Sequence, residues 1–441
     1  MNIKFLCSFL LFFAISCSVY SQTIYHFEYN FPAPNDSKYS AFFVRYDNGS
    51  GFVRLLQQAP GNETLVEMQV QEQYVSDKEA NIDTNRIFYQ ATNAQLIRGN
   101  SVTGITAPVF WFNKNPSSGL FEPAAVTTSA ESSESGQGSL SKATLIKAGD
   151  LKQPFVKQYF KEEEDFYTNL FELKPRGSSD IDRTIKLYLL VVANTNDSSI
   201  GVSCYKDMNR MVETFQDLTD YLGIGFYPIT IYGKSYNKKA IQDSIKKLQP
   251  SSKDIVVFYY TGHGFRKAGD KRRFPYLDFR EKPRDDYKVY SMNVEDIFLT
   301  ISKKPSRFNL VLSDCCNNDP SSTNVQGTPV ATGRGAGLDW NEDNVKALFL
   351  NPNKMSILAT AADIGQLASS NNNFGGFFSY FFKSSMENHF SVFKKNVTWE
   401  QVMEDAQKQT IYKADHTYCS KPYIPANICK QYPFYRKLPS E

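Results

Sequence analysis

Two stretches of the chain, DIVVFYYTGHGF (254–265) and FNLVLSDCCNN (308–318), decide the fold. Each begins with β-branched, aromatic and other apolar residues, a pattern typical of strands buried in a parallel sheet. Each ends in polar residues, so His263 follows the first strand, and Cys315 and Cys316 follow the second. Because sites in open α/β sheets form at the carboxyl ends of strands, these side chains are expected to share one site. A cysteine beside a histidine is an activated nucleophile for acyl transfer.

Outward from these stretches, strand-like and helix-like patterns alternate from about residue 184. Strands are predicted at residues 186–193, 225–233, 254–260, 308–314 and 355–362. Helices are predicted at residues 204–222, 238–248, 293–302, 377–388 and 398–411. This alternation predicts an α/β fold, with a mostly parallel sheet covered by helices on both faces.

The α/β region is preceded by a segment, residues 22–125, that reads as a small all-β domain of unknown role. Strand-like runs occupy residues 23–31, 41–46, 51–57, 64–75, 86–92 and 107–112. The sequence DNGSG (47–51) between two runs is a hairpin signal, and the whole pattern predicts a small sandwich or barrel. His26 has no partner at metal-ligand spacing, so a surface loop or a satisfied polar contact is the expected role.

Composition and pattern divide the chain after residue 125 into a linker, a connector, the α/β domain and a C-terminal tail. Residues 126–150 are rich in Ser and Gly and are predicted to be a flexible linker. Residues 151–183 are predicted to be a helical connector, and residues 184–415 the α/β domain. Residues 416–441 form a Pro- and Tyr-rich C-terminal tail, which holds Cys419 and Cys429. These two cysteines are the expected disulfide, because the tail has little core of its own; the alternative is two free, buried thiols.

The first residues of the chain have the pattern of an export signal. Residues 1–21 combine Lys4 with the apolar run FLCSFLLFFAI, and Val19 and Ser21 suit the −3 and −1 positions of a cleavage site. This pattern predicts a signal peptide cleaved before Gln22. A secreted or periplasmic protein is therefore expected, and lipid anchoring through Cys17 is the alternative. No later stretch is long and apolar enough for a membrane helix, so no stable insertion is expected once the signal is removed.

Charge excludes some partners. The formal net charge of the 441 residues is +3, which gives no indication of a nucleic-acid or anionic-membrane partner. Five cysteines remain after the predicted signal, and an odd number in an oxidising compartment indicates at least one free thiol.

Several motifs resemble the caspase superfamily (peptidase C14), and within it the metacaspase-like branch. YYTGHG (259–264) matches the family's histidine motif, and the Asp-Cys-Cys of residues 314–316 matches its nucleophile motif. The family's histidine lies about 50 residues before its cysteine, as here. GGFFSYFF (375–382) resembles the segment that closes the substrate groove, so the resemblance covers about residues 184–415. The family's His-Ser-Gly after the nucleophile is replaced here by Asn317, Asn318 and Asp319.

The resemblance implies roles for the residues that match. Cys316 would be the nucleophile, with Cys315 as a lesser option, and His263 the general base of a two-residue dyad. The backbone amides of Gly264 and Cys316 would form the oxyanion hole.

Substrate preference is also implied by the resemblance. Cys204-Tyr205-Lys206-Asp207 resembles a metacaspase element that ends in an aspartate. In that family this aspartate and the one before the nucleophile line a pocket for Arg or Lys. Cys204, Asp207 and Asp314 are therefore the expected substrate-binding residues, since two carboxylates favour a cationic side chain. The alternative for Asp207 is a helix cap.

No cofactor is required for this chemistry, but the metacaspase resemblance raises calcium as an option. Asp278, Glu295 and Asp296 lie near the positions where that family keeps calcium-binding carboxylates, and solvated surface carboxylates are the alternative reading.

The sequence thus predicts a secreted caspase- or metacaspase-like cysteine endopeptidase that acts on proteins or peptides after Arg or Lys. One alternative is an inactive binding module on the same fold, and another is a gingipain- or clostripain-like peptidase. An adhesion protein would rest on the β-domain alone, which shows no binding motif. Arg334, in the Gly-rich segment after the nucleophile, is the expected site of self-cleavage. Nothing in the sequence fixes the oligomeric state.

Overall fold

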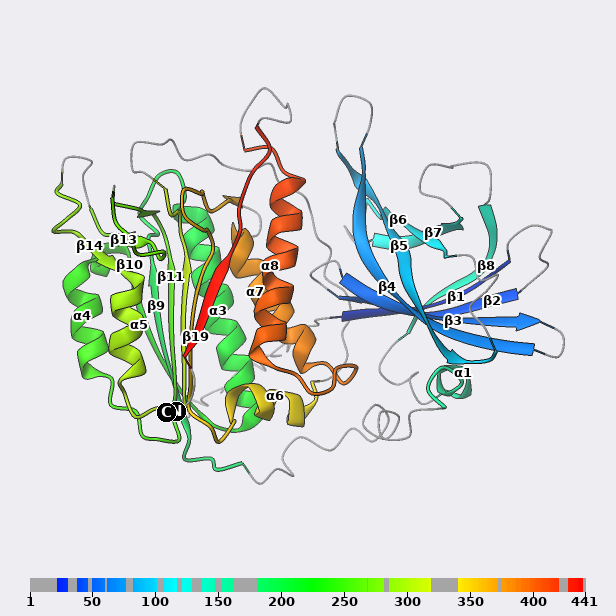
Figure 1. The fold of residues 1–441 in the computed structure, drawn as a ribbon, viewed down its shortest axis with the longest axis horizontal. Helices are drawn as coiled ribbons and strands as arrows, with labels where there is room; N and C mark the ends of the chain where they lie inside the picture. Colours follow the sequence, from blue (N-terminus) through cyan, green and yellow to red (C-terminus); the bar gives the residue numbers. More distant parts are fainter. Residues whose placement is uncertain are drawn as a thin grey trace, which may run out of the picture.

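The computed structural model shows two domains side by side, an antiparallel β-barrel and an α/β domain (Figure 1). It describes residues 22–30, 38–46, 50–59, 62–76, 82–100, 107–116, 121–128, 137–146, 153–161, 181–267, 269–280, 285–318, 340–371, 375–419 and 427–438.

The first domain is a closed barrel in which each described strand pairs antiparallel with the next, and β1 pairs with β8. Its strands are β1 (Gln22–Asn30), β2 (Lys38–Tyr46), β3 (Ser50–Ala59), β4 (Asn62–Ser76), β5 (Ile82–Arg98), β6 (Val109–Lys114), β7 (Phe121–Thr127) and β8 (Gln137–Ile146). The interior is filled by aromatic side chains such as Phe27, Phe43 and Phe112, because alternate residues of each strand point inward.

One prediction for this region needs correction. Residues 137–146 of the predicted linker form β8, which completes the barrel by pairing with β1. Of the predicted helical connector, residues 153–161 and 181–183 are described and include one short helix, α1 (Pro154–Lys157), while the rest lies outside the described residues. His26 is buried in β1, where its Nε2 lies 3.2 Å from the hydroxyl of Tyr159, so the satisfied polar contact is the correct alternative.

The second domain is built on a six-stranded sheet of order β10-β9-β11-β15-β16-β19. Its strands are β9 (Lys186–Ala193), β10 (Gly225–Tyr232), β11 (Ile255–Thr261), β15 (Phe308–Asp314), β16 (Met355–Thr360) and β19 (Phe434–Leu438). The first five are parallel, as predicted, and β19 is antiparallel to β16. β19 comes from the predicted tail, which therefore belongs to this domain rather than lying outside it.

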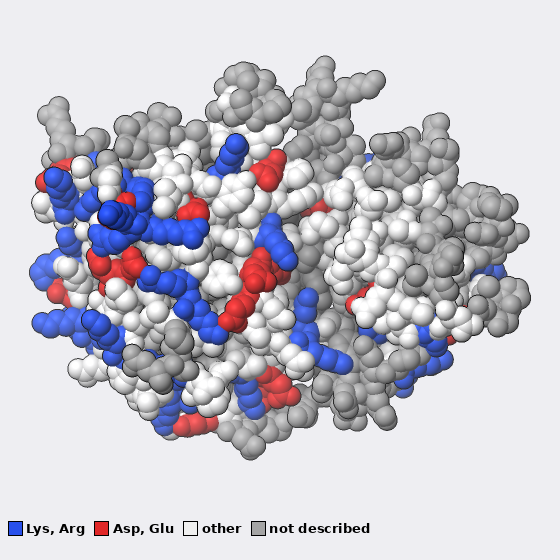
Figure 2. Space-filling model, viewed as in Figure 1, with Lys and Arg blue, Asp and Glu red and all other residues white. Residues whose placement is uncertain are grey.

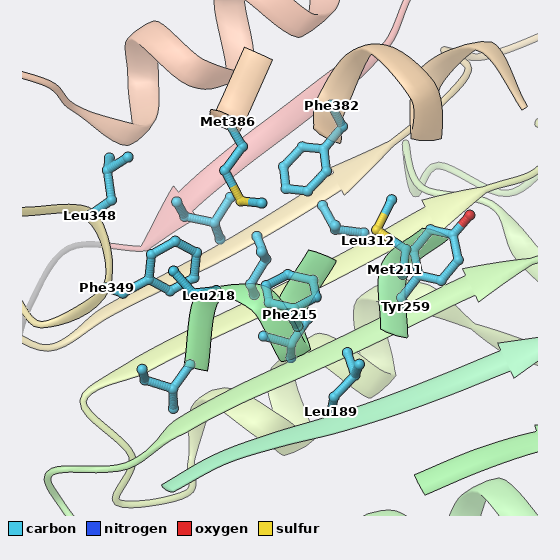
Figure 3. Packing of buried hydrophobic residues seen from close by; sticks show 14 of the residues in the cluster. Leu189, Met211, Phe215, Leu218, Tyr259, Leu312, Leu348, Phe349, Phe382 and Met386 are labelled. Atoms are coloured by element: carbon cyan, nitrogen blue, oxygen red, sulfur yellow. The ribbon is translucent and has the colours of Figure 1, made fainter. Parts of the chain in front are cut away.

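Helices cover both faces of this sheet. They are α3 (Gly201–Leu222), α4 (Lys238–Lys247), α5 (Val294–Ser302), α6 (Glu342–Phe349), α7 (Phe377–Phe390) and α8 (Trp399–Asp415). α3, α6, α7 and α8 bury their apolar residues on one face, and α4 and α5 bury theirs on the other. Figure 3 shows Met211, Phe215 and Leu218 of α3 packed on strand residues of the first face.

Two small sheets lie beside the main one. β12 (Gly264–Phe265), β13 (Tyr276–Asp278) and β14 (Ser291–Asn293) form a three-stranded antiparallel sheet directly after His263. β17 (Ser370–Asn371) pairs with β18 (Gly375–Gly376), which leads into α7. A short 3-10 helix, η2 (Gly233–Ser235), follows β10.

The barrel docks on the connection between α7 and α8. Phe393 of that connection contacts the rings of Phe42, Phe52 and Phe160, with centroids 5.7 to 6.3 Å away. Gln71 of β4 and Gln409 of α8 exchange hydrogen bonds of 3.2 and 3.3 Å. Both an apolar and a polar contact therefore join the domains.

Among the described helices, none is both long enough and apolar enough to cross a membrane.

Candidate active site

Loops after three neighbouring strands meet at the carboxyl edge of the main sheet. β11 lies between β9 and β15, and its last residue, Thr261, is level with both Ala193 and Asp314. The loop after β11 carries His263, and the loop after β15 carries Cys316. Register therefore sets the histidine and the cysteine at one edge, where both line the same cleft.

The backbone of His263 is held in place by its neighbours. Its carbonyl oxygen accepts hydrogen bonds from the Tyr260 hydroxyl at 2.6 Å and from the Asp278 amide at 3.0 Å. The ring Nε2 lies 2.9 Å from Oδ2 of Asp197, a residue of the loop after β9. Because a carboxylate can only accept, Nε2 carries the proton in this contact, and Nδ1 is left as the basic nitrogen.

The carboxylate of Asp197 is itself fixed. Its Oδ1 accepts hydrogen bonds from the Ser199 amide at 2.8 Å, the Ser199 hydroxyl at 2.6 Å and the Ile200 amide at 3.1 Å. Burial opposes ionisation, but these bonds and the neighbouring His263 outweigh it and lower the pKa of Asp197 to about 2. An ionised, oriented carboxylate therefore faces the imidazole.

The thiol of Cys316 is buried in a polar corner. Its Sγ accepts from the Ala368 amide at 3.4 Å and lies 3.9 Å from the Ala368 carbonyl oxygen. Burial raises the pKa of Cys316 to about 11, and Asp314 adds to the shift while the Ala368 amide opposes it. At neutral pH the resting group is a thiol, so attack on a carbonyl requires removal of its proton.

Gly264 allows the histidine and cysteine loops to approach closely. A Cβ at Gly264 would lie 2.6 Å from both the Cys315 sulfur and the Cys316 carbonyl oxygen. Any side chain would push the two loops apart, which explains the glycine after His263. Cys315 is buried behind this contact, and its pKa is raised well above the usual range by burial.

The cleft that these loops border is narrow, with a volume of about 40 Å³. His263 and Cys316 line it together with Cys204, Asp207 and Asp314, so all the predicted substrate-binding residues come together. The remaining lining residues are Ile200, Ser203, Thr261, Gly262, Cys315, Ala368, Ser369, Ser370 and Gly376.

The two carboxylates of the cleft are held by backbone and side-chain donors. Asp207 accepts from the Gly376 amide at 2.9 Å and from the Thr261 hydroxyl at 3.2 Å. Oδ2 of Asp314 accepts from the Ser379 amide at 2.9 Å and the Ser379 hydroxyl at 2.6 Å. Within the described part of the chain, Oδ1 of Asp314 receives no hydrogen bond, which leaves an acceptor for a ligand.

A fixed cation already faces one of these carboxylates. Arg210, one helical turn after Asp207, places Nη1 2.7 Å from its Oδ1. Burial raises the pKa of Asp207, the nearby Arg210 opposes that shift, and Asp314 adds to it. Burial likewise raises the pKa of Asp314. Two buried carboxylates that share one arginine would be stabilised by a further positive charge in the cleft.

A family comparison decides what this domain is. The family model for the caspase domain of peptidase C14 matches residues 188–436, more than half of the chain. The chain belongs to the caspase-domain peptidases of family C14. No curated protein matches it. Membership supports cysteine peptidase activity in general and protein substrates, and it favours the caspase prediction over the gingipain- or clostripain-like alternative.

The residues after Cys316 differ from the metacaspase pattern described above, and Asn317 supports the loop there. The Asn317 side chain donates to the carbonyl oxygens of Arg273 at 2.8 Å and Ala362 at 3.3 Å. Its backbone amide donates to Gln366, and its carbonyl accepts from Gly365. These bonds hold the loop that carries Cys316, although Asn317, Asn318 and Asp319 replace the His-Ser-Gly of the metacaspase pattern.

The residues predicted for calcium are not brought together. Asp278 binds Arg280 through bonds of 2.7 to 3.1 Å, Glu295 binds Arg436 at 2.6 Å, and Asp296 binds Arg272 at 3.0 Å. No cluster of three or more His, Cys, Asp or Glu side chains that could hold a metal ion occurs among the described residues. Each of these three carboxylates already pairs with an arginine, so together they do not form a calcium site.

Other predicted residues have mixed outcomes. Cys419 and Cys429 form a disulfide, with an S–S distance of 2.02 Å. Cys204 is a free, buried thiol whose pKa is raised by burial. Arg334, the predicted signal 1–21 and its Cys17 lie outside the described residues.

Sequence reasoning missed Asp197 and Arg210. The family resemblance implies a two-residue dyad of histidine and cysteine, which includes no carboxylate partner for His263. A signal was nevertheless present, because Asp197 follows the strand that neighbours the histidine strand, and its loop had to end at the same edge. Arg210 lies three residues after Asp207 on a helix, a spacing that allows an ion pair.

Proposed function

We propose that this caspase domain is an endopeptidase that cleaves peptide bonds after Arg or Lys. The observation that supports this best is the shared cleft, in which His263 and Cys316 border the mouth and two buried carboxylates lie beside them. A P1 cation bound by Asp207 and Asp314 would present its carbonyl carbon to Cys316.

In the proposed mechanism, His263 removes the proton of the Cys316 thiol as substrate binds. The thiolate attacks the carbonyl carbon, and the amides of Gly264 and Cys316 stabilise the oxyanion. The imidazolium then donates its proton to the leaving amine, which leaves a thioester on Cys316. Water, deprotonated by His263, hydrolyses the thioester and releases the free enzyme. Asp197 orients the imidazole and stabilises its charged form throughout.

The proposed specificity depends on the different contacts that the Asp207 and Asp314 carboxylates already make within the protein. Asp207 is shared with Arg210, whereas Asp314 has an oxygen without a hydrogen bond from the described residues. A guanidinium or ammonium in the narrow cleft would bind that oxygen of Asp314 and complete the charge balance. An Asp side chain there would add a third buried negative charge and would be rejected.

The decisive experiment compares fluorogenic peptides that differ only at P1, with and without calcium. We expect cleavage after Arg and Lys, none after Asp, and no requirement for added calcium, because arginines already occupy the carboxylates of the predicted calcium set. Cys316→Ala should abolish hydrolysis with little change in Tm, while Cys315→Ala keeps most of it. Efficient cleavage after Asp, or turnover by Cys316→Ala, would refute the assignment.

An inactive binding module is the second candidate, and one observation favours it. The Cys316 thiol is buried, bonded to Ala368 and raised in pKa, which describes a poorly reactive resting group. An arginine-based acyloxymethyl ketone distinguishes the two. Labelling of Cys316 that is lost in His263→Ala supports a peptidase, whereas binding of the peptide portion without labelling supports the binding module.

We also propose that the chain is exported, on the basis of its N-terminal sequence. N-terminal sequencing of the mature protein should begin at Gln22, and a blocked start at Cys17 with incorporated fatty acid would instead support lipid anchoring.

Self-cleavage after Arg334 extends the same proposal. Arg334 lies between two glycines and carries the side chain that the cleft would accept. Mass spectrometry of incubated wild-type protein should show a break after Arg334, and Cys316→Ala should remain intact. Equal nicking of both proteins would assign the break to another protease.

A further inference from the structure

A second, larger cavity of about 700 Å³ lies on the α4 and α5 side of the caspase domain. It shares no lining residue with the catalytic cleft. α4, α5, β14 and the loop between β12 and β13 surround it. Its apolar floor is made by Ile245, Met292 and Ile297, and its volume lies in the range of small-molecule sites.

The rim of this cavity is strongly basic. Five lysine and arginine side chains line it against one carboxylate, that of Asp296; the five are Lys238, Lys246, Lys267, Arg272 and Lys304. Figure 2 shows Lys and Arg side chains gathered over this part of the molecule. The net charge of the whole chain, +3, conceals this local excess.

Most of these cations lack a counter-ion within the protein. Arg272 forms ion pairs with Asp296 at 3.0 Å and with Asp270 at 3.3 Å. Lys238 and Lys304 donate to backbone carbonyl oxygens, which carry no full charge. Lys267 lies 3.9 Å from the centre of the Tyr276 ring. Its pKa is lowered, first by burial and then by Arg272, while the nearby Asp270 opposes the shift. Across the described residues, the four lysines of the rim form no ion pair.

We propose that this groove binds a small anion that carries two or more phosphate groups. The cations come from three separate segments around the cavity, so a single carboxylate could not reach them, whereas a chain of phosphates could. The floor would accept an apolar part of the same molecule. The concave shape and bounded volume favour such a ligand over a nucleic acid, which would need a continuous basic surface.

The groove and the active site are connected through the loop between β12 and β13. Lys267 and Arg272 belong to the loop that joins β12 to β13, and β12 begins at the residue after His263. Arg266 in the same loop donates its amide to the Asn318 carbonyl, two residues after Cys316. An anion that orders this loop would therefore also restrain the two catalytic loops.

Inorganic tripolyphosphate is the probe, and binding is read by calorimetry and by thermal shift of the full mature chain. These readouts do not depend on peptidase activity, so they stay informative if the proposed function fails. Lys246→Gln and Lys267→Gln should each weaken binding by about tenfold, since each removes a charge-assisted bond. Lys239→Gln is the matched control, because Lys239 lies on α4, pairs with Asp243 and does not line the groove.

A second readout locates the site. Tripolyphosphate should protect Lys246 and Lys267, but not Lys239, from acetylation followed by mass spectrometry. Citrate as a comparison anion should bind more weakly, and added salt should weaken both. Absence of binding, equal losses in all three variants, or uniform protection of surface lysines would overturn the proposal.

Discussion

At the scale of single residues, the Asp197 carboxylate fixes the orientation of the His263 ring. One of its oxygens binds Nε2 of His263, while the other is fixed by Ser199 and Ile200. The imidazole therefore cannot rotate freely, and its second nitrogen is the one left for proton transfer. Asp197 does not line the cleft, so it is a positioning residue that acts through His263.

Asp197→Asn should lower kcat by roughly 10²- to 10⁴-fold while KM changes little, because the amide cannot stabilise the imidazolium. Tm should change little, since the amide oxygen can still accept from Ser199. Steady-state kinetics with an Arg peptide test this. Asp182→Asn is the control, because Asp182 precedes β9, makes a similar turn with Thr184 and lies at the opposite end of the strand. A change in KM alone, or equal effects of both variants, would contradict the role.

The acidic pair predicts an unusual pH dependence. Burial and Asp314 raise the pKa of Asp207, so this group takes up a proton at a higher pH than an ordinary aspartate. Only the ionised form attracts a P1 cation, so the preference for Arg over its neutral analogue citrulline should rise with pH and fall as Asp207 is protonated. The ratio of the two kcat/KM values isolates this effect, because both peptides share His263 and Cys316.

Asp207→Asn provides the control for that pH profile. It should lower kcat/KM for the Arg peptide by roughly 2–4 kcal/mol, expressed as an activation free energy, and flatten the ratio against pH. A wild-type ratio that does not vary with pH would show that Asp207 is ionised throughout or does not contact P1.

At the scale of elements, the junction between β18 and α7 supplies the donors that hold the acidic pair. Gly376 donates its amide to Asp207, and Ser379 donates to Asp314. Gly376 has φ of −70°, so its backbone would suit any residue. A Cβ there would overlap the Asp314 carboxylate and lie 3.1 Å from Asp207. Contact, rather than backbone conformation, explains this glycine.

Gly376→Ala should therefore displace the carboxylates. We expect at least about a hundredfold loss of kcat/KM for the Arg peptide and a loss of about 1–3 kcal/mol in the free energy of unfolding. Urea denaturation and kinetics measure both. Gly223→Ala is the comparison, because Gly223 caps the end of α3 away from Asp207, has φ of +66° and would contact only the end of the flexible Arg183 side chain, so mainly backbone strain is added. Equal kinetic losses in the two variants would rule out the carboxylate explanation.

The same scale shows what sequence patterns could and could not predict. The apolar run before His263 predicted β11, because a strand buried on both faces needs unbroken hydrophobicity. β8 was missed because the Ser- and Gly-rich residues before it and at its start read as a linker, and because its stability comes from pairing with β1. β19 was missed because its role depends on the edge of β16, far away in sequence. The pairing of Arg272 with Asp296 is likewise a tertiary contact that local patterns do not encode, whereas the pairing of Arg210 with Asp207 lies within one helix and could have been inferred from its spacing.

At the scale of the whole molecule, an aromatic contact joins the barrel to the caspase domain. Phe393 lies in the connection between α7 and α8, and packs against Phe42, Phe52 and Phe160 of the barrel side. Among the barrel residues that the structure describes, none lines the cleft of His263 and Cys316. The contact therefore serves stability and orientation of the barrel rather than chemistry.

Phe393→Ala should uncouple the domains. Removing the ring should cost up to about 3–5 kcal/mol of docking free energy, because three aromatic partners lose their contact. Scanning calorimetry should then show two transitions where wild type shows one, and cleavage of an Arg peptide should be retained. Phe393→Leu keeps most of the apolar volume and should stay close to wild type. A single transition at unchanged temperature in Phe393→Ala would mean that the domains are held by other contacts, with Gln71 and Gln409 the next to test.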